Sequence, residues 1–183
     1  MFGYEQAKIN PDIICLSKGI TGGYMTLSTI LTTDEIYDAF YDEYENLNAF
    51  LHSHSYTANP IACSAANASL ELFKKYDTIN RNKTLASYMH KCFESIKDHP
   101  NVSDVRQKGM VLAIELIKNK KKKIPYNWKE RRGIKAYLHG LKNSVLMRPL
   151  GNVIYFMPPY VISKKQISFV SDIMKEGVDE ATK

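Results

Sequence analysis

An apolar segment that runs directly into a glycine-rich turn constrains the fold of this chain more than any other feature. Residues 11–17 (PDIICLS) combine β-branched and large apolar side chains, and residues 19–23 (GITGG) cannot continue a regular strand. We therefore expect a buried strand over residues 12–17, with Lys18 at its far end. Desolvation there favours the neutral amine, which attacks aldehydes, although most lysines at strand ends are simply solvated.

The periodicity of the whole chain predicts an α/β protein with a boundary near residue 77. Residues 1–76 should continue with a strand over 26–31, a helix from Thr33 to Glu45, a loop over 46–57 and a helix that begins at Asn59-Pro60 and ends near Lys75. Residues 77–183 should contain a helix over 79–97, strands over 102–108 and 110–117, a helix over 128–141, strands over 145–148 and 153–157, and a helix capped by Ser163 that ends near Ala181. The strand over 110–117 is expected to be apolar on both faces.

The first of these two parts is too small to form a complete sheet domain. Two neighbouring strands need flanking strands before they can bury a face, so the pattern predicts that upstream sequence belongs to the same fold. The sequence shows no internal repeat and no linker rich in Gly, Pro or Ser between the two parts.

Composition places the chain among ordinary globular proteins. Its 183 residues are 44% hydrophobic and 24% charged, which is enough to bury one core or two small ones. There is no apolar stretch long enough to cross a bilayer and no signal-like N-terminus, so a cytoplasmic protein with no membrane partner is expected. Cys15, Cys63 and Cys92 are odd in number and widely spaced, which favours reduced, buried thiols over disulfides or a metal site.

The positive charge is concentrated in one run, residues 118–123 (KNKKKK). We interpret this run as a solvated loop, because closely spaced like charges repel and no aromatic or groove-fitting helix of a nucleic-acid module accompanies it. Salt-dependent binding that is lost on neutralising these lysines would instead indicate a nucleic-acid partner. His52 and His54 face the same way in an extended segment, but no carboxylate or thiol nearby completes a set of metal ligands.

Residues 52–60 (HSHSYTANP) form a second motif, directly before an expected helix. A hydroxyl side chain beside the free N–H groups of a helix N-terminus can bind an anion such as phosphate. The alternative is a simple Ser or Thr cap on that helix.

Residues 147–160 (MRPLGNVIYFMPPY) form a third motif. Arg148 should end an apolar strand and be fixed by the Pro-x-Gly turn that follows, and its planar guanidinium matches a carboxylate in bidentate fashion. A salt bridge within the second part of the chain explains the same residue equally well.

The segment from Lys18 to Gly23 resembles the lysine region of the class III (ω-amino acid) aminotransferases, in which an S/G-K-G-x-x-G-G stretch carries the lysine bound to pyridoxal 5'-phosphate. The resemblance implies a fold type I PLP-dependent transferase and makes Lys18 the catalytic, cofactor-binding lysine. It covers essentially the whole chain, which corresponds to the C-terminal portion of such an enzyme. Residues 1–76 would be the end of the large PLP-binding domain, and residues 77–183 the small C-terminal α/β domain.

The same resemblance assigns roles in the second motif. In the family, a Ser or Thr at the position of Ser55 reaches across a homodimer to the cofactor phosphate of the other subunit. We group His54 with this cofactor site and Ser53 with the substrate site. Relatives often have Thr where Ser55 stands, and Gly where Ser53 and Ala58 stand.

Residues 24–33 (YMTLSTILTT) and the third motif are most similar to the biotin-pathway branch of the family, the diaminopelargonic acid synthases. That match implies that Arg148 binds the carboxylate of 8-amino-7-oxononanoate and that Tyr155 lies near the same site. The amino donor, S-adenosylmethionine or lysine, stays open.

The family's Gly-Ser phosphate turn, its ring-stacking aromatic and its aspartate on the pyridine nitrogen cannot be placed in residues 1–17. The chain alone is therefore expected to be incompetent as an enzyme. The alternatives are another class III enzyme that acts on an ω-amino acid, and a non-catalytic fragment that only dimerises.

Overall fold

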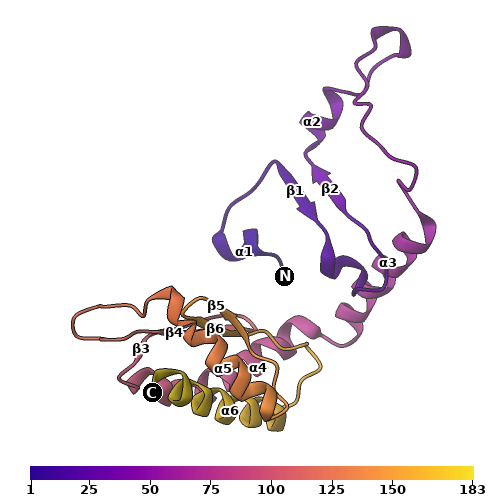
Figure 1. The fold of residues 1–183 in the computed structure, drawn as a ribbon. Coiled ribbons are helices and arrows are strands. Elements are labelled where there is room, and N and C mark those ends of the chain that lie inside the picture. The colour runs from indigo at the N-terminus through magenta and orange to yellow at the C-terminus, as the bar shows by residue number, and fades with distance from the viewer. The chain divides into compact units, whose positions relative to one another are not determined.

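A computed structural model describes residues 1–183 as two compact units, Met1–Ile79 and Asn80–Lys183 (Figure 1). The boundary falls inside a helix, α4, which spans Thr78–Cys92. None of the helices combines the length and the apolar character that crossing a membrane requires.

Unit 1 has little regular structure. Its elements are α1 (Gly3–Ala7), β1 (Ile13–Leu16), the 3-10 helix η1 (Lys18–Thr21), β2 (Thr29–Thr32), α2 (Asp34–Asp38), the 3-10 helix η2 (Tyr44–Asn46) and α3 (Pro60–Lys75). The strands β1 and β2 pair antiparallel, with Ile13 opposite Thr32 and Leu16 opposite Thr29, and form a sheet of only two strands. Each strand therefore keeps one edge without a strand partner.

Three predictions for unit 1 differ from the structure. The strand expected over 26–31 is displaced, because β2 spans Thr29–Thr32. The strand β1 is not buried, since the Ile13 side chain is 56% exposed; two strands on their own cannot bury a face. The helix expected as far as Glu45 ends at Asp38. Beyond it the Asp42 carboxylate accepts hydrogen bonds from the Glu43 N–H and from two Asn side chains, and such local side-chain bonds compete with helix formation.

Unit 2 is a four-stranded antiparallel sheet packed against helices. Its elements are α4, the 3-10 helix η3 (Glu94–Asp98), β3 (Val102–Lys108), β4 (Val111–Leu116), the 3-10 helix η4 (Trp128–Glu130), α5 (Arg132–Lys142), β5 (Arg148–Leu150), β6 (Val153–Phe156) and α6 (Lys164–Thr182). The strand order is β3-β4-β6-β5, so β3 and β5 form opposite edges of the sheet. In Figure 1, α5 and α6 lie side by side beneath this sheet.

One face of the sheet carries the core of unit 2. Leu112, Ile114 and Ile154 are fully buried there and belong to one cluster with Met89 of α4 and Met174 of α6. The opposite face is open and of mixed character. In β4 it carries Val111, which is exposed, and Ala113 and Glu115, which are half-buried, so the prediction of apolar residues on both faces holds for Val111 and Ala113 but not for Glu115.

Several boundaries in unit 2 also differ from prediction. The helix α4 stops at Cys92, before η3, and Arg131, in the left-handed conformation, separates η4 from α5. The strand predicted over 145–148 is displaced, because β5 begins at Arg148. Its register is set by the two-residue turn of Gly151 and Asn152, which places Leu150 opposite Val153.

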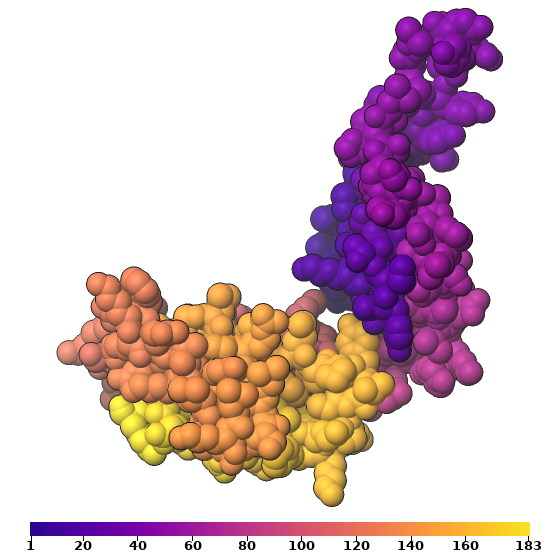
Figure 2. Space-filling model, turned by 45° about the vertical axis from the view of Figure 1, so that its right-hand side comes forward, coloured from indigo at the N-terminus to yellow at the C-terminus, as the bar shows by residue number.

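The three cysteines complete the comparison of the structure with the sequence predictions. All three thiols are free, as expected, but Cys15 is exposed, and Cys63 and Cys92 are half-buried, so the prediction of buried thiols is wrong. No group of three or more His, Cys, Asp or Glu side chains could hold a metal ion. In Figure 2 the surface of residues near 125 (orange) borders the end of α6 (yellow), as the hydrogen bond from Tyr126 to Thr182 requires.

Candidate active site

Lys18 lies at a fixed turn in unit 1, and its amine is free. It follows β1 directly, opens η1 and adopts a left-handed φ of 52°. Thr21, which is 2% exposed, donates a hydrogen bond from Oγ1 to the Met25 carbonyl, and Gly22 at φ 63° closes η1. The Lys18 side chain is exposed and makes no hydrogen bond or ion pair within the chain, so the turn is held by Thr21 and the amine stays available.

The exposed position contradicts the expected partial desolvation of Lys18. That expectation rested on a buried strand, and β1 is half to fully open to solvent in the two-stranded sheet. Within this chain the amine is therefore identified as a candidate by its place at the strand–turn junction, not by burial.

A cavity of about 560 Å³ lies in unit 1 beside the residues that follow this turn. Its lining comes from two segments, residues 24–28 and the loop before α3, and comprises Tyr24, Met25, Thr26, Leu27, Ser28, His54, Tyr56, Thr57, Ala58, Asn59 and Ala62. Of the predicted site residues only His54 borders it, while Lys18, Ser53 and Ser55 do not. Its volume is in the range of small-molecule sites.

The loop before α3 is ordered by His54 and by a residue that the sequence analysis missed, Thr57. The His54 N–H donates to Thr57 Oγ1 at 3.1 Å, and the Thr57 N–H donates back to the His54 carbonyl at 2.9 Å. The Tyr56 N–H donates to His54 Nδ1 at 3.1 Å. The available sequence signal for this turn is a Thr in a loop, because Thr hydroxyls form hydrogen bonds with nearby backbone groups in turns.

Ser55 is exposed and its hydroxyl makes no hydrogen bond within the chain. The cap of α3 is Asn59, whose Oδ1 accepts from the N–H groups of Ile61 and Ala62 at 3.0 Å each. A Ser or Thr cap on this helix is therefore wrong. The first N–H groups of α3 are already used by Asn59. The hydroxyls of Ser53 and Ser55 are both exposed and unbonded within the chain, so these side chains remain available to an anion.

Arg148 and Tyr155 come together in unit 2. They are directly opposite each other on β5 and β6, on the open face of the sheet, and the Arg148 guanidinium carbon lies 5.8 Å from the centre of the Tyr155 ring. A cation–π contact uses no N–H group of the guanidinium as a hydrogen-bond donor to a carboxylate, so those groups stay free for one. Arg148 is exposed and has no carboxylate partner within the chain.

A second arginine on the same face provides the contrast. The row across the sheet runs Arg106, Ala113, Tyr155, Arg148. Arg106 donates to Asp104 at 2.9 Å and to Glu115 at 2.7 Å, and these hydrogen bonds raise its pKa further. The internal salt bridge that was the alternative for Arg148 is thus made by Arg106, and Arg148 is left unneutralised.

Two groups in unit 1 have the chemistry to bind pyridoxal phosphate, and by the resemblance stated above Ser55 would meet the cofactor of the other subunit. A free primary amine at Lys18 suits an aldehyde, and the unbonded Ser55 hydroxyl suits a phosphate. The chemistry of these donors therefore agrees with the cofactor that a class III aminotransferase uses.

Comparison with known proteins identifies the family to which this fold and these motifs belong. The family model "Aminotransferase class-III" matches residues 1–178. The adenosylmethionine-8-amino-7-oxononanoate aminotransferase of Helicobacter pylori is 43% identical over 187 aligned residues, covering 100% of this chain and 41% of that protein. The enzyme of that name from Methanocaldococcus jannaschii is 41% identical over 171 residues, 93% of this chain and 37% of its own length.

Solved structures agree. The crystal structure of the Methanocaldococcus jannaschii aminotransferase matches with a TM-score of 0.89 and 39% identity, over 97% of this chain and 40% of that one. An ω-transaminase from Pseudomonas jessenii matches with a TM-score of 0.92 at 22% identity, which shows the fold alone. The fold is thus that of part of a PLP-dependent transaminase.

The chain belongs to the class III aminotransferase family. It spans about 40% of the length of the relatives it matches. The assignment of residues 1–76 and 77–183 to a large and a small domain, the roles of individual site residues and the cytoplasmic location stay predictions.

Proposed function

We propose that this chain supplies the lysine and the acceptor-binding part of a PLP-dependent aminotransferase of biotin biosynthesis. The reaction transfers an amino group to the ketone of 8-amino-7-oxononanoate and gives 7,8-diaminononanoate, while the donor's amine carbon becomes a carbonyl. The observation that carries the proposal is the unneutralised Arg148, which lies over the Tyr155 ring, whereas Arg106 on the opposite edge strand is neutralised by two carboxylates. The names and identities of the relatives, 43% in the first case, support the biotin-pathway branch over other class III enzymes.

Each site residue has one task. Lys18 holds the cofactor covalently through Nζ, and the same amine, once displaced by the donor, takes up a proton as general base and returns it as general acid. When bound, the cofactor supplies a ring that withdraws electrons from the reacting carbon. Ser55, with His54 beside it, binds the phosphate, and we propose that it does so for the second subunit of a homodimer.

Arg148 fixes the acceptor by its carboxylate, far along the chain from the ketone that reacts. We place Tyr155 under the guanidinium and Ser53 with the same substrate. Binding energy from such a remote group orients the reacting carbon, which is why its loss affects turnover as well as affinity.

Covalent trapping tests the lysine assignment. The chain, in an enzyme that binds the cofactor, is incubated with pyridoxal phosphate, reduced with borohydride and digested for peptide mapping. We expect the reduced phosphopyridoxyl group on Lys18 and its loss in Lys18→Ala, with Lys8→Ala as a control that keeps the label. A label on any other lysine would disprove the assignment.

A further inference from the structure

The β5–β6 hairpin, which contains Arg148, packs directly against the start of α5. Gly133, the second residue of α5, is buried, and a Cβ built on it would lie 2.5 Å from the Gly151 carbonyl oxygen and 2.9 Å from Pro149 Cβ. Both neighbours belong to the β5–β6 hairpin and neither is a flexible side-chain tip. Only a glycine lets α5 approach the hairpin this closely.

Asn152 ties the same turn down on a second side. Its Nδ2 donates to the Tyr126 carbonyl at 2.8 Å, and its own carbonyl accepts from the Leu116 N–H at 2.8 Å. One side-chain bond and one main-chain bond thus hold a single residue between β4 and the segment that leads into α5.

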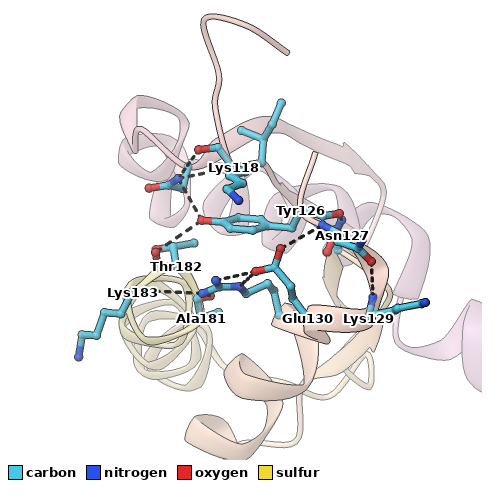
Figure 3. Close-up of polar contacts among 12 residues, drawn as sticks. Lys118, Tyr126, Asn127, Lys129, Glu130, Ala181, Thr182 and Lys183 are labelled. Carbon is cyan, nitrogen blue, oxygen red and sulfur yellow. Dashed lines mark hydrogen bonds and ion pairs between the residues drawn. The ribbon is translucent and has the colours of Figure 1, made fainter. Parts of the chain in front are cut away.

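The segment behind Asn152 is itself anchored. The Tyr126 hydroxyl accepts a hydrogen bond from Asn101 at 3.1 Å and donates one to the Thr182 carbonyl at 3.5 Å, and Figure 3 shows this ring lying between Lys118 and Glu130. Arg132, next to Gly133, donates to the Ala181 carbonyl at 3.0 Å. The backing of the turn is therefore part of the core of unit 2 rather than a free loop.

The contacts of Gly133 and Asn152 with the β5–β6 turn, which we call the clamp, are linked by the geometry to Arg148. Pro149 faces α5, while its neighbour Arg148 lies on the opposite face of the sheet beside Tyr155. Since β5 is only three residues long, a shift of Pro149 or Gly151 moves Arg148 with it.

We propose that Gly133 and Asn152 are positioning residues for the acceptor: they hold the β5–β6 turn against α5 and so fix where the Arg148 guanidinium meets the carboxylate. This inference rests on the proposed function of Arg148. In Gly133→Ala the hairpin must retreat by about 1 Å to reach ordinary contact distance, and a misplacement of that size can cost up to about a hundredfold in rate.

The test uses the 183-residue chain and the NMR signal of the Arg148 Nε–Hε group. 8-Amino-7-oxononanoate and its methyl ester are titrated separately, and the initial slope of the shift is measured for each. In the wild-type chain we expect Arg148 to respond to the acid and not to the ester, while the neutralised Arg106 responds to neither. In Asn152→Ala, which removes one hydrogen bond and keeps the turn glycine, the response to the acid should fall about tenfold.

Val102→Ala is the control for a general loss of stability. Val102 is 1% exposed and lies on β3, at the edge of the sheet opposite β5, so this variant should melt earlier and keep the full Arg148 response. Gly133→Ala is expected to behave like Asn152→Ala. Should it fail to fold, Asn152→Ala decides alone.

The outcomes separate the inference from the function on which it rests. If wild-type Arg148 does not distinguish acid from ester, the proposed role of Arg148 is wrong and the inference falls with it. If the wild-type chain does distinguish them and a folded Asn152→Ala keeps the full response, Arg148 binds the carboxylate but the clamp does not position it.

Discussion

At the scale of single residues, the open face of the unit 2 sheet holds two arginines with opposite surroundings. Arg106 is matched by two carboxylates, whereas Arg148 is matched by a ring. The difference is set by what lies opposite each residue in the ladder, since Tyr155 faces Arg148 and Glu115 is diagonal to Arg106. The two carboxylates hold Arg106 within the sheet, whereas the N–H groups of Arg148 stay free for a ligand.

Arg148→Ala should therefore act on acceptor binding and Arg106→Ala on stability. In an active enzyme containing this chain, loss of the bidentate contact should reduce kcat/KM for 8-amino-7-oxononanoate by about a hundredfold, because each charge-assisted hydrogen bond contributes about 1.5–3 kcal/mol. The half-reaction with the donor should change little. Equal losses in both half-reactions, measured in single turnovers, would contradict an acceptor-specific role.

The ion pair of Glu130 with Arg132 predicts how the stability of the fold changes as the pH is lowered. Arg132 donates to its Oε2 from Nη2 at 2.7 Å and from Nε at 3.0 Å, and these bonds lower the pKa of Glu130. A lowered pKa in the folded state means that the pair stabilises the fold above the unfolded pKa, about 4.3, and that the contribution is lost as pH falls through the folded value. Urea midpoints of wild type and Glu130→Gln should differ at neutral pH and converge in acid; a constant gap would contradict the pair.

At the scale of elements, sequence patterns predicted best where an element is long and where its ends are fixed by residues close to it in the sequence. The cap at Ser163, the start of α3 at Asn59-Pro60, the strand Val102–Lys108 and the last helix lie where periodicity and capping residues place them. The fold class and the family are confirmed by the comparisons.

The misses have two physical reasons: some elements depend on contacts between distant residues, and others on short-range side-chain bonds that hydrophobic periodicity does not reveal. The strand β5 differs from its predicted position because its register is set by pairing with β6. The helix predicted as far as Glu45 stops at Asp38 because side-chain hydrogen bonds to Asp42 replace helical ones. Gly133 and Asn152 were missed because their roles are visible only as distances to distant residues, and Thr57 because its bond with His54 is a side-chain bond that periodicity does not show. Whether the predicted site residues act as assigned stays a prediction.

The cap of α6 carries an element-scale prediction. Ser163 Oγ accepts from the Gln166 N–H at 3.2 Å, and the Gln166 side chain accepts from the Ser163 N–H at 2.9 Å, a reciprocal capping box. Ser163→Ala should lower the free energy of unfolding of unit 2 by about 1 kcal/mol. Ser87→Ala, in the middle of α4, should change it by much less, and equal effects in thermal melts would argue against the cap.

At the scale of the whole molecule, the two units differ in how much they bury. Unit 2 contains the core cluster, including Met89, Phe93 and Ile154 at 0% exposure, whereas in unit 1 only Thr21, Ala62 and Ala66 are buried. Stability that comes from burial should therefore be concentrated in residues 80–183.

Hydrogen exchange should show this division directly. We expect the amides of β4 and β6 to exchange slowly, at rates set by global unfolding of unit 2, and those of β1 and β2 to exchange within the fast phase. Residues 78–183, expressed alone, should keep the same protection in β4 and β6. Uniform protection across both units would contradict independent stability.

Residues 1–79 taken by themselves leave surfaces open that a larger sheet would cover. The outer edges of β1 and β2 are unpaired, and apolar side chains are open both in the sheet, where Ile30 is 66% exposed, and in the loop before α3, where Phe50 is 68% exposed. Open strand edges and exposed apolar side chains are the features that aggregation uses and that chaperones and proteases recognise. A polypeptide limited to residues 1–183 should therefore be removed quickly by quality control, and its steady-state amount should rise sharply when a protease that degrades unfolded chains is deleted.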